Sequence, residues 1–193
     1  MNKKVVLSDA CTDKISYALL EMPVGELFVA CMDGKVIYAS LIGCDADLGL
    51  VGSFCVASNQ MELGIAGLRE FLEVIKVQGY KLDPNYDDVF RLVNAIKTHD
   101  DPIAYFELYG TEFQQKVWRA VVQIKKGKVV TYSKLAEMVG RPKAVRAVAN
   151  ALAANNIAFL IPCHRVIRSD GSCGGYRWGE RVKRQLISRE AAK

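Results

Sequence analysis

The sequence predicts a mixed α/β fold, with a strand-rich N-terminal part and a helix-rich C-terminal part. Residues 15–21, 27–32 and 35–41 are rich in β-branched and aromatic side chains, which favour strands. Further along, apolar residues recur at helical spacing between turn signals. A chain of 193 residues is long enough for two small domains, and we expect them over residues 1–108 and 109–193.

Turn residues predict how the first strands are connected. Pro-Val-Gly at 23–25 separates the first two strands, and Asp-Gly at 33–34 is a strong hairpin signal between the next two. This pattern predicts a three-stranded antiparallel meander. Amphipathic helices are then expected over 61–77 and 87–98, followed at 103–108 by one more strand or a linker.

Four helices are expected in the C-terminal part. Thr111 and Gln114 have the spacing of a capping box, from which a first helix runs to Gly127. After a short extended segment, Ser133 is expected to cap the second helix. The remaining helices are expected over residues 134–139, 143–154 and 181–191.

Charge is distributed unevenly along the chain. The net charge is +5, yet residues 1–108 contain 9 basic and 16 acidic side chains, whereas residues 109–193 contain 17 basic and 5 acidic ones. Such an excess of positive charge over residues 109–193 is typical of a protein that binds phosphate groups, although a basic surface can also simply be solvated. The Gly-Arg-Pro turn at 140–142 gives its two flanking helices the form of a helix-turn-helix, which is often only a packing motif. Together the two features favour nucleic acid as the partner.

The helix after that turn has unusual side chains for a helix that reads DNA. Residues 143–151 are mostly small, whereas helices in the major groove normally present Arg, Asn and Gln to the bases. A smooth face suits the narrower minor groove, and Arg146, which stands among alanines and valines, could enter the base stack. The alternative is an alanine-rich packing helix with Arg146 on the surface.

Cys163 is the candidate nucleophile. An apolar run over 158–161 leads to it, and His164 follows at once. The thiolate is the reactive form of cysteine, and basic neighbours lower its pKa. On an extended segment adjacent side chains point to opposite faces, so a bridging water could carry the proton to His164, with Glu190 orienting the ring. The alternative is a buried thiol beside a surface histidine.

The other cysteines show no ligand pattern. None of the six forms a CxxC pair, so neither a disulfide framework nor a structural zinc cluster is indicated. Cys31 and Cys44 are interpreted as small buried apolar residues, and any further roles of Cys11, Cys44, Cys55 and Cys173 stay open. With no apolar run of bilayer length and no secretory signal, the protein is expected to be intracellular, in the cytoplasm of a prokaryote or the nucleus of a eukaryote, and not to act on membranes.

Five stretches of the C-terminal part occur together, in this order and with similar gaps, in one known family. They are residues 110–118, 131–132, 140–148, 161–166 and 174–179. They resemble the O6-alkylguanine-DNA alkyltransferases, and most of all the C-terminal part of the bacterial adaptive-response alkyltransferase. The resemblance implies a ribonuclease-H-like N-terminal domain with an antiparallel sheet, followed by a helical domain with a helix-turn-helix.

The resemblance also implies an activity. The protein would bind double-stranded DNA from the minor groove, flip an O6-alkylguanine out, and transfer the methyl or other alkyl group to itself once and irreversibly. It would act as a monomer without a cofactor. Cys163 would be the acceptor, His164 and Glu190 its water-linked proton relay, Asn155 the hinge beside the active-site segment, and Tyr176 the hydrogen-bond donor to the base.

Further residues are assigned to DNA and to the substrate pocket by the same resemblance. Arg146 would replace the flipped guanine in the duplex, and Tyr132 would press on the neighbouring phosphate. The other expected DNA contacts are Thr131, Ala144, Val145, Ala147 and Ala149. The expected pocket residues besides Tyr176 are Val166, Arg177 and Trp178.

The sequence departs from the family pattern at a few positions. Many relatives have proline at the position of Asn156. Many also have a small residue after the pocket tyrosine, whereas this chain has Arg177 followed by Trp178. The adaptive-response branch shares the bulky pair, so a methyl group is expected to fit and a benzyl group is not. Some animal members bind zinc near the position of Cys31, but Val36 replaces the expected histidine, so no metal is expected.

Two other functions compete with alkyl transfer. Some relatives only sense alkylated guanine, but they lack the cysteine that is present here as Cys163. A thiol-sensing DNA-binding regulator would need sequence-specific binding, which the small side chains of 143–151 disfavour. The chain leaves no room for the regulatory half of the adaptive-response protein, so transcriptional activity is not expected.

Overall fold

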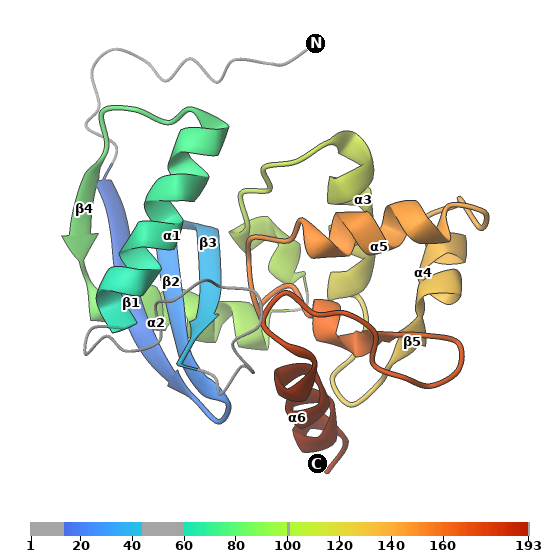
Figure 1. The fold of residues 1–193 in the computed structure, drawn as a ribbon. Helices are drawn as coiled ribbons and strands as arrows, with labels where there is room; N and C mark the ends of the chain where they lie inside the picture. The colour runs from blue at the N-terminus through green and yellow to red at the C-terminus, as the bar shows by residue number, and fades with distance from the viewer. Residues whose placement is uncertain (1–13, 44–59, 100, 193) are drawn as a thin grey trace.

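The computed structural model describes residues 14–43, 60–99 and 101–192, which fold into a sheet with two helices and a mainly helical part beside it (Figure 1). The mixed α/β prediction is confirmed. Cys11, Cys44 and Cys55 lie outside the described residues. The elements are β1 (Lys14–Met22), β2 (Gly25–Met32), β3 (Lys35–Ile42), α1 (Gln60–Ile75), β4 (Lys81–Pro84), α2 (Tyr86–Thr98), η1 (Pro102–Tyr105), α3 (Glu112–Val122), β5 (Val130–Thr131), α4 (Tyr132–Met138), α5 (Val145–Ala153), η2 (Cys163–Arg165), β6 (Val166–Ile167) and α6 (Glu180–Ala191).

The main sheet has the strand order β3-β2-β1-β4. The first three strands form the expected antiparallel meander, and Asp33 and Gly34 at the second hairpin both have positive φ, as a tight Asp-Gly hairpin turn requires. Strand β4, which pairs parallel to β1, was not predicted from the sequence. Its four residues end in Pro84 and are too few to show an alternating pattern.

Helices α1 and α2 cover opposite faces of the sheet (Figure 1). Phe28 packs with Leu68 and Leu72 of α1, whereas its neighbour Leu27 belongs to the cluster that contains Val89 of α2. Successive residues of a strand point to opposite faces, so both faces of β2 are buried. That second cluster continues into the C-terminal helices, and one apolar core therefore joins the two parts of the chain.

The C-terminal helices confirm some boundaries and correct others. The capping box is present, with the Gln114 amide donating to Thr111 Oγ1 at 3.3 Å and the Thr111 amide donating to Gln114 Oε1 at 2.7 Å. The helix ends at Val122, however, and does not run to Gly127. Ser133 is not a cap, because Thr131 Oγ1 accepts from the Lys134 amide at 3.1 Å.

The segment at 103–108 is neither a full strand nor a plain linker. A short 3-10 helix, η1, is followed by one bridge between Phe106 and Val36 of β3. Ala39, further along the same strand, forms a second bridge with Ile157. Its amide donates to Asn156 O at 2.8 Å, and its carbonyl accepts from the Ala158 amide at 2.9 Å. The outer edge of β3 thus holds the segment that leads to Cys163.

None of the helices in the described ranges is both long and apolar enough to cross a bilayer.

Candidate active site

Cys163 lies at the start of η2, a 3-10 turn, and not on a strand as the sequence suggested. Its side chain is buried, and its Sγ accepts a hydrogen bond from Asn155 Nδ2 at 3.4 Å. Asn155 is 1% exposed and also contacts the backbone of Ile157 and Ile161 at 2.9 to 3.3 Å. One buried amide therefore fixes both the hinge segment and the sulfur.

His164 is fully buried, which rules out the surface histidine of the alternative interpretation. Its Nε2 lies 3.2 Å from Glu190 Oε1. Because a carboxylate only accepts, the neutral ring carries its hydrogen on Nε2 and leaves Nδ1 as an acceptor. Nδ1 is buried and has no hydrogen-bond partner within the described part of the chain. Burial lowers the pKa of His164, although Glu190 opposes this, so the ring is neutral at neutral pH.

Glu190 is shared between two partners. Arg165 donates to both of its carboxylate oxygens at 2.8 Å, through Nε and Nη2, while His164 contacts Oε1. Burial opposes ionisation, but the hydrogen bonds from His164 and Arg165 outweigh it and hold the pKa of Glu190 at about 2. Glu190 is therefore a fixed anion that orients the imidazole.

The pKa of Cys163 differs from the sequence expectation. Burial raises it, and the Asn155 hydrogen bond and the Lys183 ammonium lower it only in part. The resting group is thus the thiol, because desolvation of an anion outweighs the basic neighbours. A base must take its proton before it can attack.

Lys183 is a site residue that sequence analysis missed. It is 1% exposed, its Nζ lies 5.7 Å from the centre of the Tyr132 ring, and burial lowers its pKa. No acidic side chain of the described residues forms an ion pair with it. The signal was present, since Lys183 lies on the same buried side of α6 as Val182 and Leu186.

A pocket of about 880 Å³ lies between α5 and the segment after η2, with Cys163 among its lining residues. The structure brings most of the expected DNA and substrate residues to this pocket. Those that line it are Tyr132, Val145, Arg146, Ala149, Tyr176, Arg177 and Trp178.

Four other expected residues lie elsewhere. Val166 is fully buried, pairs with Val130 and is not among the residues that line this pocket, so its assignment to the substrate pocket stays a prediction. Thr131 uses its hydroxyl to cap α4. Ala144 precedes α5 as its N-cap, and Ala147 is exposed on that helix.

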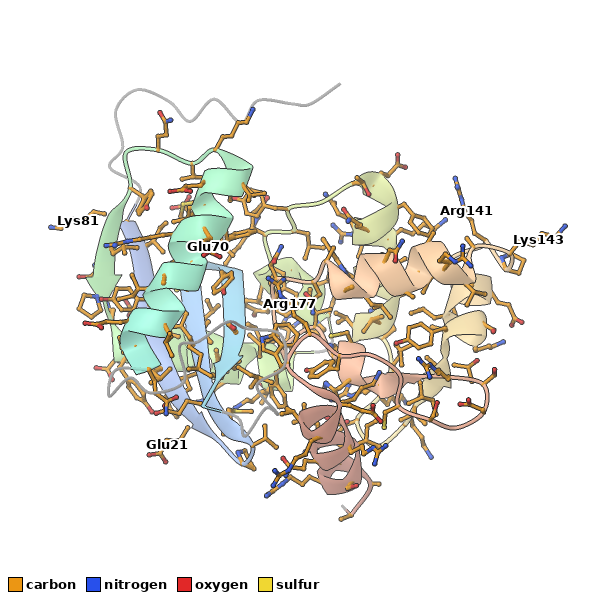
Figure 2. All side chains as sticks on the ribbon, viewed as in Figure 1. Glu21, Glu70, Lys81, Arg141, Lys143 and Arg177 are labelled. Carbon is orange, nitrogen blue, oxygen red and sulfur yellow. The ribbon has the colours of Figure 1, made fainter. Side chains whose placement is uncertain are left out.

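Charged side chains mark the end of the molecule remote from the sheet. Figure 2 shows Arg141 and Lys143 projecting outward at the turn before α5, on the side away from β1 to β4. Arg146 is exposed on the same helix, whose buried residues are Val148, Ala151 and Leu152. The exposed side of α5 and the turn before it therefore present small side chains together with the long basic side chains of Arg141, Lys143 and Arg146.

The wall of the pocket contacts the sheet. Trp178 Nε1 donates to Ser40 Oγ of β3 at 3.1 Å. Arg177 Nη1 donates to Asn156 Oδ1 at 2.8 Å and to Asn155 O at 3.3 Å. Figure 2 shows Arg177 between the sheet and the C-terminal helices.

Fold and site together define a class: a mixed α/β protein with a buried, hydrogen-bonded cysteine next to a basic helical face. Residues 112–192 match the family model of the 6-O-methylguanine DNA methyltransferase DNA-binding domain. Over 177 residues the chain is 30% identical to a methylated-DNA–protein-cysteine methyltransferase of Candida glabrata, covering 91% of this chain and 84% of that protein. The chain therefore belongs to the methylated-DNA–protein-cysteine methyltransferase family.

Other relatives match part of the chain or its fold. The regulatory protein Ada of Salmonella typhimurium is 51% identical over 106 residues, which are 54% of this chain and 30% of that protein. The chain thus spans less than a third of the length of this relative. The O6-methylguanine methyltransferase structure of Mycobacterium tuberculosis aligns with a TM-score of 0.63 at 26% identity, over 92% of this chain and 93% of that one. The same organism's protein in complex with DNA aligns equally well, at 25% identity over 93% of both chains.

Proposed function

We propose that this protein repairs O6-alkylguanine in duplex DNA by taking the alkyl group onto Cys163, once per molecule. The observation that carries the proposal is the buried Cys163 thiol, which is held by Asn155 and lines the same pocket as Arg146 and Tyr132. Family membership supports this activity. The Candida glabrata relative is named for this activity, and a family structure from Mycobacterium tuberculosis holds DNA.

The first chemical step is removal of the Cys163 proton. His164 is neutral and keeps Nδ1 available, so it accepts the proton through a bridging water. The proton stays on the imidazole, because Glu190, with a pKa of about 2, stabilises the imidazolium without taking the proton. Asn155 then donates to the developing thiolate.

The second step is displacement at the alkyl carbon. The thiolate forms an S–C bond, the C–O6 bond breaks, and its electron pair goes to the guanine. Tyr176 lines the same pocket and donates a hydrogen bond to the departing base. The product is a thioether, which nothing in the site can hydrolyse, so each molecule reacts once.

Access to a base within a duplex requires base flipping, at a free-energy cost of a few kcal/mol. We propose that α4 and α5 act as a helix-turn-helix in the minor groove. The small Ala147 and Ala149 permit close approach, and Arg146 fills the space of the flipped guanine. Residues 1–108 would then be a ribonuclease-H-like structural domain, and residues 109–193 the DNA-binding and alkyltransferase domain.

The test is the intact mass of the protein after incubation with a duplex that contains one O6-methylguanine. We expect a gain of one methyl group per molecule, on the peptide that holds Cys163. The variant Cys163→Ser should bind the lesion but gain no mass, while Cys173→Ser, a matched change on the neighbouring segment, should react. Methyl transfer to Cys163→Ser would overturn the proposal, and lesion binding without any transfer by the natural protein would identify a damage sensor.

A further inference from the structure

The pocket wall formed by residues 176–178 belongs to a segment without regular structure of its own. Strand β6 ends at Ile167 and α6 begins at Glu180, so the intervening residues form a long loop. Such loops keep a fixed position only where contacts outweigh the loss of chain entropy. The contacts that hold this wall are therefore as much a part of the site as the wall itself.

Two side-chain hydrogen bonds tie the wall to a common anchor. Trp178 Nε1 donates to Ser40 Oγ at 3.1 Å, across 138 residues of sequence. Arg177 Nη1 donates to Asn156 Oδ1 at 2.8 Å, and its guanidinium carbon lies 5.9 Å from the centre of the Trp178 ring. The two anchors are neighbours, because Ala39, next to Ser40, pairs with Asn156 and Ala158.

The same anchor reaches Cys163 from the other side. Asn155, adjacent to Asn156, donates to Cys163 Sγ at 3.4 Å. The outer edge of β3 thus fixes the nucleophile through the hinge and the opposite wall through Trp178. Contacts with one strand of the N-terminal part, β3, therefore fix the positions of both sides of the pocket.

We propose that Ser40 and Asn156 are positioning residues that latch residues 176–178 over the pocket and so set the size of the alkyl group that is accepted. The inference rests on the proposed function. It connects two departures from the family pattern, Asn156 in place of proline and Arg177 in place of a small residue. A proline at position 156 would have no side-chain oxygen to accept a hydrogen bond from Arg177. Tyr176 and Trp178 line the same pocket as Cys163, so we expect the latched wall to limit the room beside the sulfur to a small alkyl group.

The test compares single-turnover transfer rates from duplexes containing O6-methylguanine and O6-benzylguanine. Ser40→Ala and Asn156→Leu should each slow methyl transfer about three- to tenfold, as expected for one lost hydrogen bond that fixes reacting geometry. In both variants the benzyl rate should rise or hold, so that the methyl-to-benzyl ratio falls. DNA affinity and melting temperature should stay close to those of the natural protein.

Conservative and matched variants separate a latch from general damage to the fold. Ser40→Thr keeps the hydroxyl and Asn156→Asp keeps an acceptor, so both should restore the natural ratio. Ser16→Ala, at a partly buried serine of the same sheet, should leave both rates unchanged. In Ser40→Ala combined with Trp178→Phe, the loss should not exceed that of the worse single variant, because both remove one hydrogen bond.

Distinct results would overturn the two proposals. Should the natural protein transfer neither alkyl group, the proposed function itself would fail. Should it transfer methyl while Ser40→Ala and Asn156→Leu keep the natural rates and ratio, the latch alone would be rejected. An additive loss in the double variant would equally reject direct coupling between Ser40 and Trp178.

Discussion

The sheet part and the helical part of this molecule bury different kinds of side chain. Over the described residues up to 108, the buried side chains are aliphatic, aromatic or sulfur-containing. The three buried polar or charged side chains of the described structure, Asn155, His164 and Lys183, all belong to the helical part. All three influence Cys163, either by direct contact, by adjacency or by charge.

This difference separates stability from chemistry. Buried apolar groups stabilise a fold, whereas buried polar groups destabilise it unless they are well paired. The helical part accepts that penalty around one sulfur, which is typical of a functional site. Within the described ranges, the hydrogen bonds and bridges from the sheet to the site come from the outer edge of β3.

Apart from replacement of Cys163 itself, the largest loss of transfer is expected when Asn155 is changed. In Asn155→Ala the thiolate loses its donor and the hinge loses three backbone contacts. We expect methyl transfer to fall about a hundredfold, the scale of a small misplacement of reacting groups. Rapid-quench kinetics would measure this, with Asn94→Ala in α2 as the control. A natural rate in Asn155→Ala would show that the amide only supports the fold.

The next effect concerns pH. Glu190 has a pKa of about 2 against an ordinary value of 4.5. Because that pKa is depressed in the folded protein, its contribution to stability is present above pH 4.5 and is lost as pH falls toward 2. In Glu190→Gln this pH-dependent stability should vanish. The difference in unfolding free energy between the natural protein and the variant, measured by urea unfolding, should therefore be smaller at about pH 3 than at about pH 7.

The same variant should change the pH profile of transfer. Burial lowers the pKa of His164 and Glu190 opposes that, so loss of the carboxylate lowers the His164 pKa further. The rising limb of the rate profile should move to lower pH, and the plateau should fall by roughly tenfold or more because the base is weaker. An unchanged limb would show that His164 is not the base.

A smaller loss is expected at Lys183. Lys183→Met replaces a buried ammonium, which has no ion-pair partner in the described part of the chain, by an apolar side chain of similar length. The Cys163 pKa should rise further and transfer should slow about tenfold. Stability should nevertheless increase by about 1 kcal/mol, because a buried charge is removed.

The control for Lys183→Met is Arg184→Met, which removes one positive charge from the exposed neighbour that pairs with Glu180. Arg184→Met should leave the transfer rate unchanged. It should also leave unchanged the pH dependence of Cys163 labelling by iodoacetamide, which reports the Cys163 pKa. Destabilisation together with normal transfer in Lys183→Met would contradict the separation of stability from chemistry.

Lys183 also shows where prediction from the sequence stops. The meander and the capping box were predictable because turn residues and spacing are local signals, whereas the grouping of Cys163 with Tyr132, Arg146 and Tyr176 was implied only by the family resemblance. Helical spacing places Lys183 beside Val182 and Leu186, but whether its ammonium is buried or reaches solvent depends on how α6 packs, which that spacing does not report. The balance that keeps Cys163 protonated likewise depends on tertiary burial.

The same reason explains the missed contacts of the wall. Ser40 and Trp178 lie 138 residues apart, and neither belongs to a pattern that names the other. Strand β4 was missed for want of length, and Thr131 was not recognised as a cap because Ser133 offered an equally suitable hydroxyl. Val166 was assigned to the pocket by its place in a motif, yet its pairing with Val130 buries it.

The smallest effect on transfer is expected from a change that damages only the sheet part. Gly64 of α1 lies against the fully buried Phe28, and a Cβ at this position would overlap the aromatic ring. Alanine favours helices over glycine by about 1 kcal/mol, but overpacking a core costs about 1–3 kcal/mol, so Gly64→Ala should be destabilising on balance. Although Phe28 pairs with Ser40 across β2 and β3, the backbone pairing of these strands does not depend on the position of the ring, so the latch and the pocket should persist in the folded fraction. We therefore expect a lower melting temperature in calorimetry and an unchanged single-turnover rate well below that temperature.

The exposed change Ala66→Gly in the same helix should lower stability through helix propensity alone. A slower transfer step in folded Gly64→Ala would show that the sheet interior, and not only the edge of β3, positions the site.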